Sequence, residues 1–203
     1  MSDDGLELNL SDKKEKRLLV KVIWINLSQV ALAGVVGLII NSSGLLGTAL
    51  DSSGDTAVYL VSLYAVGKSS QAKVRAASFA GVFLSILGVL LLVDVARRFF
   101  EGSEPVGWAM IIVAIINTAS NFWVVRLLKS DKQGGVHIKA SIIFTDNDIW
   151  INLGIVVSGL CVMIFKSFIP DLVIGFIVVI ISIKGGWEIL KNAMETKRNS
   201  IKN

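Results

Sequence analysis

The feature that most constrains this chain is a series of long apolar stretches. Of its 203 residues, 53% are hydrophobic and only 18% are charged, which is far too apolar for an ordinary soluble domain. A helix that crosses the hydrocarbon core of a bilayer, about 30 Å thick, needs roughly 20 mostly apolar residues. The sequence therefore predicts an all-α integral membrane protein, with spans at residues 18–41, 46–66, 74–97, 105–128, 138–165 and 169–190.

The second and fifth stretches contain polar interruptions, so hydropathy alone leaves a four-helix bundle open as an alternative. The distribution of Lys and Arg decides between the two. With six spans and both chain ends in the cytoplasm, only Arg97, Arg98 and Lys166 of the 20 basic residues fall on the opposite side. Cytoplasmic loops of membrane proteins carry an excess of basic residues. The predicted fold is a bundle of six transmembrane helices with both termini cytoplasmic.

This topology predicts three parts: a cytoplasmic N-terminal segment (1–17), a six-helix transmembrane transport domain (18–192), and a short cytoplasmic tail (193–203) without a soluble C-terminal domain. The first segment mixes acidic and basic residues, unlike a signal peptide, so we expect the first span to be retained. Basic loops that face anionic lipid headgroups account for the net charge of +4, so no nucleic-acid partner is expected. A bacterial inner (plasma) membrane is the expected location.

Cysteine and histidine, two common metal ligands, each occur once. Cys161 lies within the fifth span and has no cysteine partner, which excludes a disulfide within the chain and a Cys metal cluster. We expect it to be an apolar packing residue. His137 lies at the start of the fifth span and is expected to be an interfacial polar residue rather than a ligand. Any metal chemistry must therefore come from oxygen donors.

Four aspartates lie well inside predicted spans, where an ionised carboxylate is penalised by at least a few kcal/mol. Asp51 and Asp55 are four residues apart, which places them on one face of a helix. Asp146 and Asp148 are only two apart and point to different sides, so the fifth span offers one well-placed acid. Because the centres of these two spans contain no Lys or Arg, a cation site is favoured over a structural polar cluster, which remains the alternative.

Four segments, taken in order, resemble a known family. They are "SSGLLGTALDSSGD" in the second span, "EPVGWAMIIVAIINTASNFWVVRLLK" in the fourth, "IKASIIFTDNDIWINLGIVVSG" in the fifth and "PDLVIGFIVVIISIKGGWEILKNAME" in the sixth. The chain resembles the cation diffusion facilitators, which export divalent transition metals, commonly zinc, in exchange for protons. The resemblance implies that Asp51 and Asp55 match both positions of the second-helix motif and that Asp148 matches the last position of the fifth-helix motif. Phe144 stands where the family usually has His or Asp.

The resemblance thus implies a metal site with three carboxylates, whereas a tetrahedral zinc site has four N, O or S ligands. The fourth donor is expected to be water, a backbone carbonyl or one of the weaker candidates Thr145, Asp146 and Asn147; Asn152, one turn beyond Asp148, is a further candidate to line the cavity. Oxygen donors favour harder ions such as Mn²⁺ or Mg²⁺, with Fe²⁺ between these and zinc. The expected cargo is a divalent metal ion: Zn, Mn, Fe, Co or Cd.

Crowded carboxylates without metal cannot all stay ionised, so at least one takes up a proton that returning metal displaces. We therefore expect a secondary transporter, not an enzyme, that works by alternating access. Its expected partners are a divalent cation, protons and the lipid bilayer, with a homodimer formed through membrane helices. The alternatives are a non-transporting metal-binding or regulatory membrane protein of the same fold and, less favoured, an exchanger of protons for an organic cation.

Overall fold

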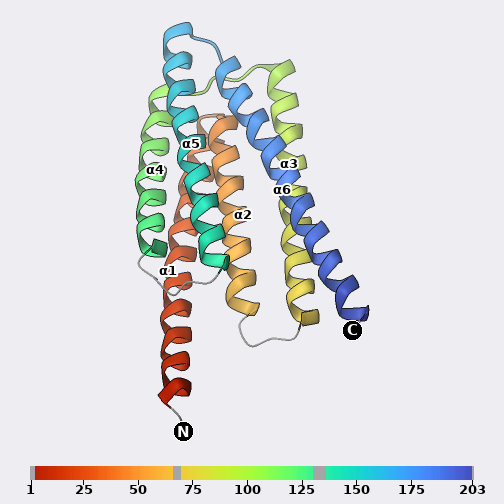
Figure 1. Ribbon diagram of the computed structural model, residues 1–203. Helices are drawn as coiled ribbons and strands as arrows, with labels where there is room; N and C mark the ends of the chain where they lie inside the picture. Colours follow the sequence, from red (N-terminus) through yellow and green to blue (C-terminus); the bar gives the residue numbers. More distant parts are fainter. Residues whose placement is uncertain (1–2, 66–69, 130–135, 203) are drawn as a thin grey trace.

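The described residues of the chain fold into six helices that lie side by side in a bundle (Figure 1). The computed structural model describes the backbone of residues 3–65, 70–129 and 136–202, and side chains within residues 16–64, 74–129 and 148–195. Both termini lie at the same end of the bundle (Figure 1). The predicted all-α membrane bundle of six helices is confirmed: α1 (Asp3–Ile39), α2 (Ser43–Ala65), α3 (Ser70–Glu101), α4 (Gly107–Lys129), α5 (Val136–Phe165) and α6 (Ile169–Lys202).

Five helices of the described chain are long and apolar enough to cross a membrane: α1, α3, α4, α5 and α6. Helix α2 is missing from this group because Asp51, Asp55 and their neighbouring serines lower its hydropathy. It contacts each of the other five helices and is buried or half-buried from Ser42 to Tyr59. A helix too polar for lipid is thus accommodated by surrounding it with protein.

The helix ends at the far side from the termini follow from local backbone chemistry. Helices α1 and α5 are followed by Asn41 (φ 51°) and Lys166 (φ 48°), and α3 by Gly102 (φ 84°). A residue in the left-handed region is the usual way to end a helix and reverse the chain. Pro170 then occupies the first turn of α6, where its missing N–H costs nothing. Short turns of three residues therefore join α1 to α2 and α5 to α6.

Glycine pairs let helices approach closely at two crossings. A Cβ atom on Gly159 would lie 2.8 Å from the carbonyl oxygen of Gly107, across the α4 and α5 contact. At the α3 and α6 contact, a Cβ on Gly81 would lie 2.9 Å from the carbonyl oxygen of Gly186. Small residues are enriched at such crossings because lipid provides no hydrophobic force that drives helices together. Close packing of the two backbones provides the attraction instead.

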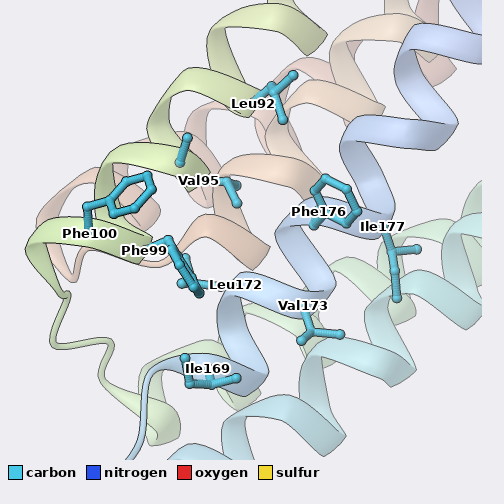
Figure 2. A pocket seen from close by; sticks show the side chains of 10 residues that line it. Leu92, Val95, Phe99, Phe100, Ile169, Leu172, Val173, Phe176 and Ile177 are labelled. Atoms are coloured by element: carbon cyan, nitrogen blue, oxygen red, sulfur yellow. The ribbon is translucent and has the colours of Figure 1, made fainter.

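An apolar groove of about 400 Å³ lies between the ends of α3 and α6 (Figure 2). Its walls are carbon side chains, among them Phe99, Phe100, Phe176 and Ile177. Because a cation needs oxygen, nitrogen or sulfur donors, this groove is not where a metal would bind. A metal site would therefore lie among the polar side chains inside the bundle.

The glycine contact between α4 and α5 leads to the first prediction. Gly159→Ala should destabilise the bundle by about 1–3 kcal/mol, because the new methyl group has no room beside Gly107. Gly34→Ala is the matched control: its Cβ would lie 3.6 Å from Ala49, an ordinary contact, and alanine favours the helix. Thermal unfolding in detergent should show a lower Tm for Gly159→Ala alone. Equal Tm values for the two variants would show that the crossing tolerates a methyl group.

Candidate metal-binding site

The structure brings together the acidic residues of α2 and α5. Asp51 and Asp55 lie one turn apart on α2 and are half-buried, and Asp148 on α5 is 8% exposed. The Asp148 carboxyl group lies within hydrogen-bonding reach of those of both Asp51 and Asp55. Three carboxyl groups from two helices that are distant in sequence thus meet inside the bundle.

Carboxyl groups this close are not comfortably all ionised unless a proton or a cation lies between them. An ionised carboxylate only accepts hydrogen bonds, so a hydrogen bond between two of these groups would need a proton on one of them. Among the described side chains, no three from His, Cys, Asp and Glu already have the arrangement of a metal cluster. The carboxyl groups would therefore have to turn towards a common point for one metal ion to be held by all three.

Two buried oxygen atoms of the site, one in a carboxyl group and one in an amide, have no hydrogen-bond partner in the described part of the chain. One is Oδ2 of Asp55 and the other is Oδ1 of Asn152. Asn152 is 1% exposed and its Nδ2 donates to the backbone carbonyl of Asp148 at 2.9 Å, which fixes the amide beside that residue. A buried acceptor without a donor is costly in itself and is well suited to a cation.

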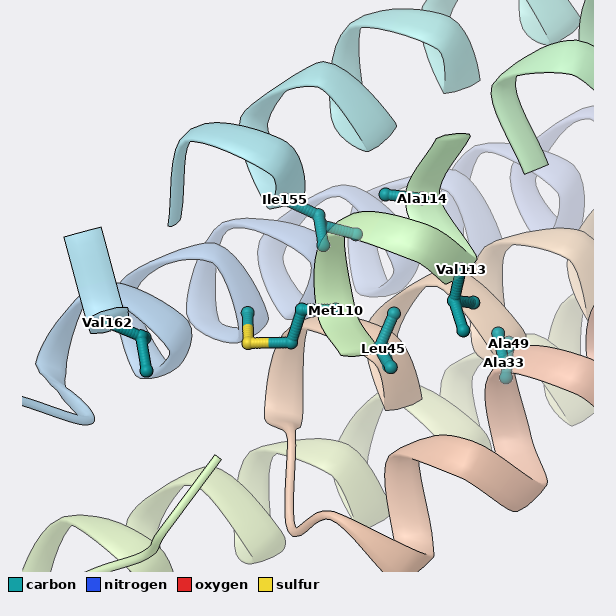
Figure 3. Packing of buried hydrophobic residues seen from close by; sticks show 8 residues of the cluster. All are labelled: Ala33, Leu45, Ala49, Met110, Val113, Ala114, Ile155 and Val162. Carbon is teal, nitrogen blue, oxygen red and sulfur yellow. The ribbon is translucent and has the colours of Figure 1, made fainter. Parts of the chain in front are cut away.

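The site lies between two apolar clusters of the bundle. The first cluster contains Leu45 and Ala49 of α2 and its partners from α1, α4 and α5 (Figure 3). The second contains Tyr59 of α2 with residues of α1 and α4. Asp51 and Asp55 fall between these two layers of apolar packing. Apolar side chains thus close the polar site on both sides along α2. A barrier across a membrane requires such closure.

The remaining predicted residues fall outside the described side chains. Phe144, Thr145, Asp146 and Asn147 belong to the helical backbone of α5, which begins at Val136. Their side chains, and that of His137, lie outside the described part of the structure, so their predicted roles stay predictions. Cys161 is a free, half-buried cysteine of α5.

Sequence reasoning gave no role to Asp171, which the structure shows to cap α2. This α6 residue is 0% exposed and accepts hydrogen bonds from Ser42 Oγ (2.7 Å), Ser43 N (2.6 Å) and Gly44 N (3.0 Å). Free N–H groups at a helix start favour a negative charge. The helix that carries Asp51 is thus held at its first turn by a carboxylate from α6.

A second buried charge, that of Arg98 in the last turn of α3, lies near this cap. Arg98 has a side chain only 4% exposed, and its Nε donates to Asp94 at 2.5 Å. Its charge also acts favourably on Asp171. The signal available in the sequence was "NSSG" (residues 41–44) at the start of α2, a capping pattern, but only the tertiary structure shows which acid completes it.

The cap leads to the second prediction. Asp171→Ala should destabilise the bundle by roughly 1–3 kcal/mol, because the buried N–H groups of Ser43 and Gly44 lose their acceptor. Ser120→Ala is the matched control, because the Ser120 hydroxyl is exposed and bonds only to its own helix. Thermal unfolding in detergent should show a clear loss for Asp171→Ala and none for Ser120→Ala. Parent-like stability of Asp171→Ala would contradict the role of the cap.

Comparison with known proteins assigns the chain to a family. The profile of the cation efflux transmembrane domain matches residues 19–196, nearly the whole chain. The chain belongs to the cation efflux family. This family is the group of cation diffusion facilitators that the sequence motifs resemble, so that prediction is confirmed. The match to a transmembrane domain, together with the apolar helices, makes the chain a multi-pass integral membrane protein.

Two curated relatives resemble this cation efflux chain. The zinc transporter ZitB of Yersinia pestis is 23% identical over 197 residues, and ZitB of Yersinia pseudotuberculosis is equally similar. Each alignment covers 90% of this chain and 62% of the relative. The chain therefore spans less than two thirds of the length of these relatives. Both relatives are named as zinc transporters.

Proposed function

We propose that this protein is a secondary active transporter that exports a divalent transition metal from the cytoplasm in exchange for protons. The observation that carries the proposal is the meeting of Asp51, Asp55 and Asp148 inside a membrane bundle. Helix α2 contains neither Lys nor Arg, and residues 148–165 of α5, whose side chains are described, contain none either. Without a basic counterion, a cation is the partner that best offsets the burial of these carboxylates.

Asp51, Asp55 and Asp148 are the proposed metal ligands. Asn152 is the best supported fourth donor, because its Oδ1 is buried beside Asp148 without a partner among the described residues. Thr145, Asp146 and Asn147 remain candidates. Four oxygen donors favour Mn²⁺ or Fe²⁺ over Zn²⁺, whereas the relatives are named as zinc transporters. The proposed cargo therefore includes Zn, Mn, Fe, Co and Cd.

Proton exchange follows from the same three side chains. Their closeness favours a bound proton when no metal is present, and a metal ion binds only to deprotonated carboxylates. Metal binding then releases protons, and proton binding releases metal. An inward proton gradient would drive metal out of the cytoplasm through this exchange.

Alternating access is the proposed movement. Rocking of the bundle would open the site to one side of the membrane at a time. The even number of helices places both termini at one end, and the basic residues favour the cytoplasm for that end. The proposed organisation is a cytoplasmic segment (1–17), a transport domain (18–192) and a tail (193–203), in a homodimer through membrane helices of a bacterial plasma membrane.

Metal-driven proton flux provides the third prediction. The purified protein is reconstituted in liposomes with an internal pH dye and exposed in turn to Zn²⁺, Mn²⁺, Fe²⁺, Co²⁺ and Cd²⁺. Asp51→Asn, which removes charge but keeps the size, should lower the flux at least tenfold because a ligand and a proton site are lost. Glu104→Gln, a change of the same kind at an exposed loop acid, should match the parent. Flux that is independent of metal, or unchanged in Asp51→Asn, would refute the transporter.

A second function deserves a test because Phe144 occupies a usual ligand position of the family. Loss of that ligand is compatible with a metal-binding or regulatory protein of the same fold that moves no metal. Calorimetry on the purified protein separates the two proposals when it is read beside the liposome flux. Metal binding that depends on Asp51, without any flux, would favour the regulatory protein.

Phe144 also provides the fourth prediction, on metal selectivity. Phe144→His should add a nitrogen donor and raise the affinity for Zn²⁺ relative to Mn²⁺ by about tenfold, since imidazole suits zinc better than manganese. Competition binding with the two metals measures the ratio. Phe144→Leu is the control, because it changes size without adding a donor. An unchanged ratio in Phe144→His would mean that residue 144 does not face the site.

A further inference from the structure

The apolar groove between the ends of α3 and α6 is open to the surroundings of the bundle. Side chains along it are largely exposed: Phe99 (60%), Phe100 (85%), Val173 (51%) and Phe176 (48%). Because the chain is a multi-pass membrane protein, the medium over these side chains is the lipid of the bilayer. A volume of about 400 Å³ is in the range of sites that hold a small molecule. One lipid chain can therefore lie deeper among the helices here than its neighbours in the bilayer.

The groove follows the two helices from their ends toward the middle of the bundle (Figure 2). Phe100 and Ile169 lie at its mouth, because they belong to the last turn of α3 and the first turn of α6. Leu92 and Ile177 lie eight residues further along these helices, which is a distance of about 12 Å along a helix axis. An acyl chain in a bilayer has the same direction, from the headgroups toward the membrane centre. The groove thus has the shape for one extended acyl chain.

Basic side chains gather at the mouth of the groove. Arg97, Arg98 and Lys166 are the three basic residues at the end opposite the termini, and all three are close in sequence to groove residues. Arg98 is bonded to Asp94, and Arg97 is ion-paired with Asp94 (2.9 Å) and with Glu101 (3.6 Å). Both arginines therefore have carboxylate partners within α3.

Lys166 differs from the two arginines. It is exposed and has no ion pair within the described part of the chain. Its left-handed backbone (φ 48°) reverses the chain between α5 and α6. Three peptide units, which span at most about 11 Å, separate it from Ile169 in the groove wall. Since lysines at helix ends extend their flexible side chains to the headgroup level, the ammonium can reach a phosphate at the mouth of the groove.

We propose that this groove binds one anionic phospholipid, with an acyl chain between α3 and α6 and its phosphate on Lys166. The acyl chain gains contacts with two helices, and the phosphate accepts a charge-assisted hydrogen bond from the ammonium. A headgroup with one negative charge balances the one basic group at the mouth that has no carboxylate partner. The site is separate from Asp51, Asp55 and Asp148, so it does not depend on the proposed metal transport.

The walls of the groove favour a lipid over a helix of a second copy of the chain. Helices in a membrane approach one another closely where small residues lie, as Gly81 and Gly186 do between α3 and α6. Among the side chains that line the groove in the described structure, only that of Ala96 is small. Large aromatic and branched side chains hold a second helix away, whereas a flexible acyl chain can follow the space between them.

The fifth prediction concerns the headgroup. The purified protein, stripped of lipid in detergent, is titrated with phosphatidylglycerol, which carries one negative charge, or with zwitterionic phosphatidylcholine. Native mass spectrometry counts the bound lipid. The first phosphatidylglycerol should bind about fivefold more tightly than phosphatidylcholine, as expected for one lysine beside an anionic lipid. Lys166→Gln should remove this preference. Lys129→Gln, which removes the same charge from an exposed lysine at the end of α4, should keep it.

The same titration tests the position of the acyl chain. Ala96→Trp fills the groove from an exposed position on α3 and should weaken the first phosphatidylglycerol by about tenfold, because the chain loses its contacts. Val89→Trp is the matched control. Val89 is 50% exposed on the same helix and is not part of the groove wall, so this variant should bind lipid as the parent does.

Three outcomes would overturn the proposal. Equal affinity of the parent for the two lipids would show that the headgroup charge is not recognised. Parent-like binding of phosphatidylglycerol in Ala96→Trp would show that the acyl chain lies elsewhere. A dimer of the lipid-free parent that Ala96→Trp dissociates and Val89→Trp does not would make a second copy of the chain the occupant of the groove.

Discussion

The burial of three carboxyl groups inside a membrane bundle is the constraint on which the rest of this structure depends. Asp51 and Asp55 make α2 too polar to face lipid, so α2 contacts all five other helices and is shielded by them. Asp148 meets both acids from α5, where protons or a cation can reduce the cost of their charge. The arrangement of the bundle is thus the means by which an otherwise unfavourable helix is tolerated.

Contacts at the two ends of α2 hold this helix in its place among the other five. Asp171 of α6 caps its first turn with three hydrogen bonds, and Gly44 leaves room for that carboxylate. Apolar layers around Ala49 and Tyr59 then enclose the acids from both directions. A site that binds a charged cargo in a membrane needs both features: a rigid placement of its ligands and an apolar closure around them.

Membership of the cation efflux family and the oxygen-rich site have different implications for the metal. The family relationship connects the chain to proteins named as zinc transporters, at 23% identity. The described donors near the site are carboxylate and amide oxygens, which favour harder ions. Metal preference is set by a few ligands, whereas the fold is set by the whole hydrophobic pattern, so a family can keep one and vary the other.

Hydropathy and charge determined the six helices, because apolar length and the placement of Lys and Arg are local properties of the chain. The spacing of Asp51 and Asp55 likewise determined their common helix face. Only the tertiary structure decided that Asp148 meets both acids, that Asp171 caps α2, and that α3 and α6 leave an apolar groove between their ends. These are contacts between segments that are distant in the sequence. They depend on how the helices cross and in which register, and side-chain packing between helices sets both. No local pattern in the sequence encodes that packing.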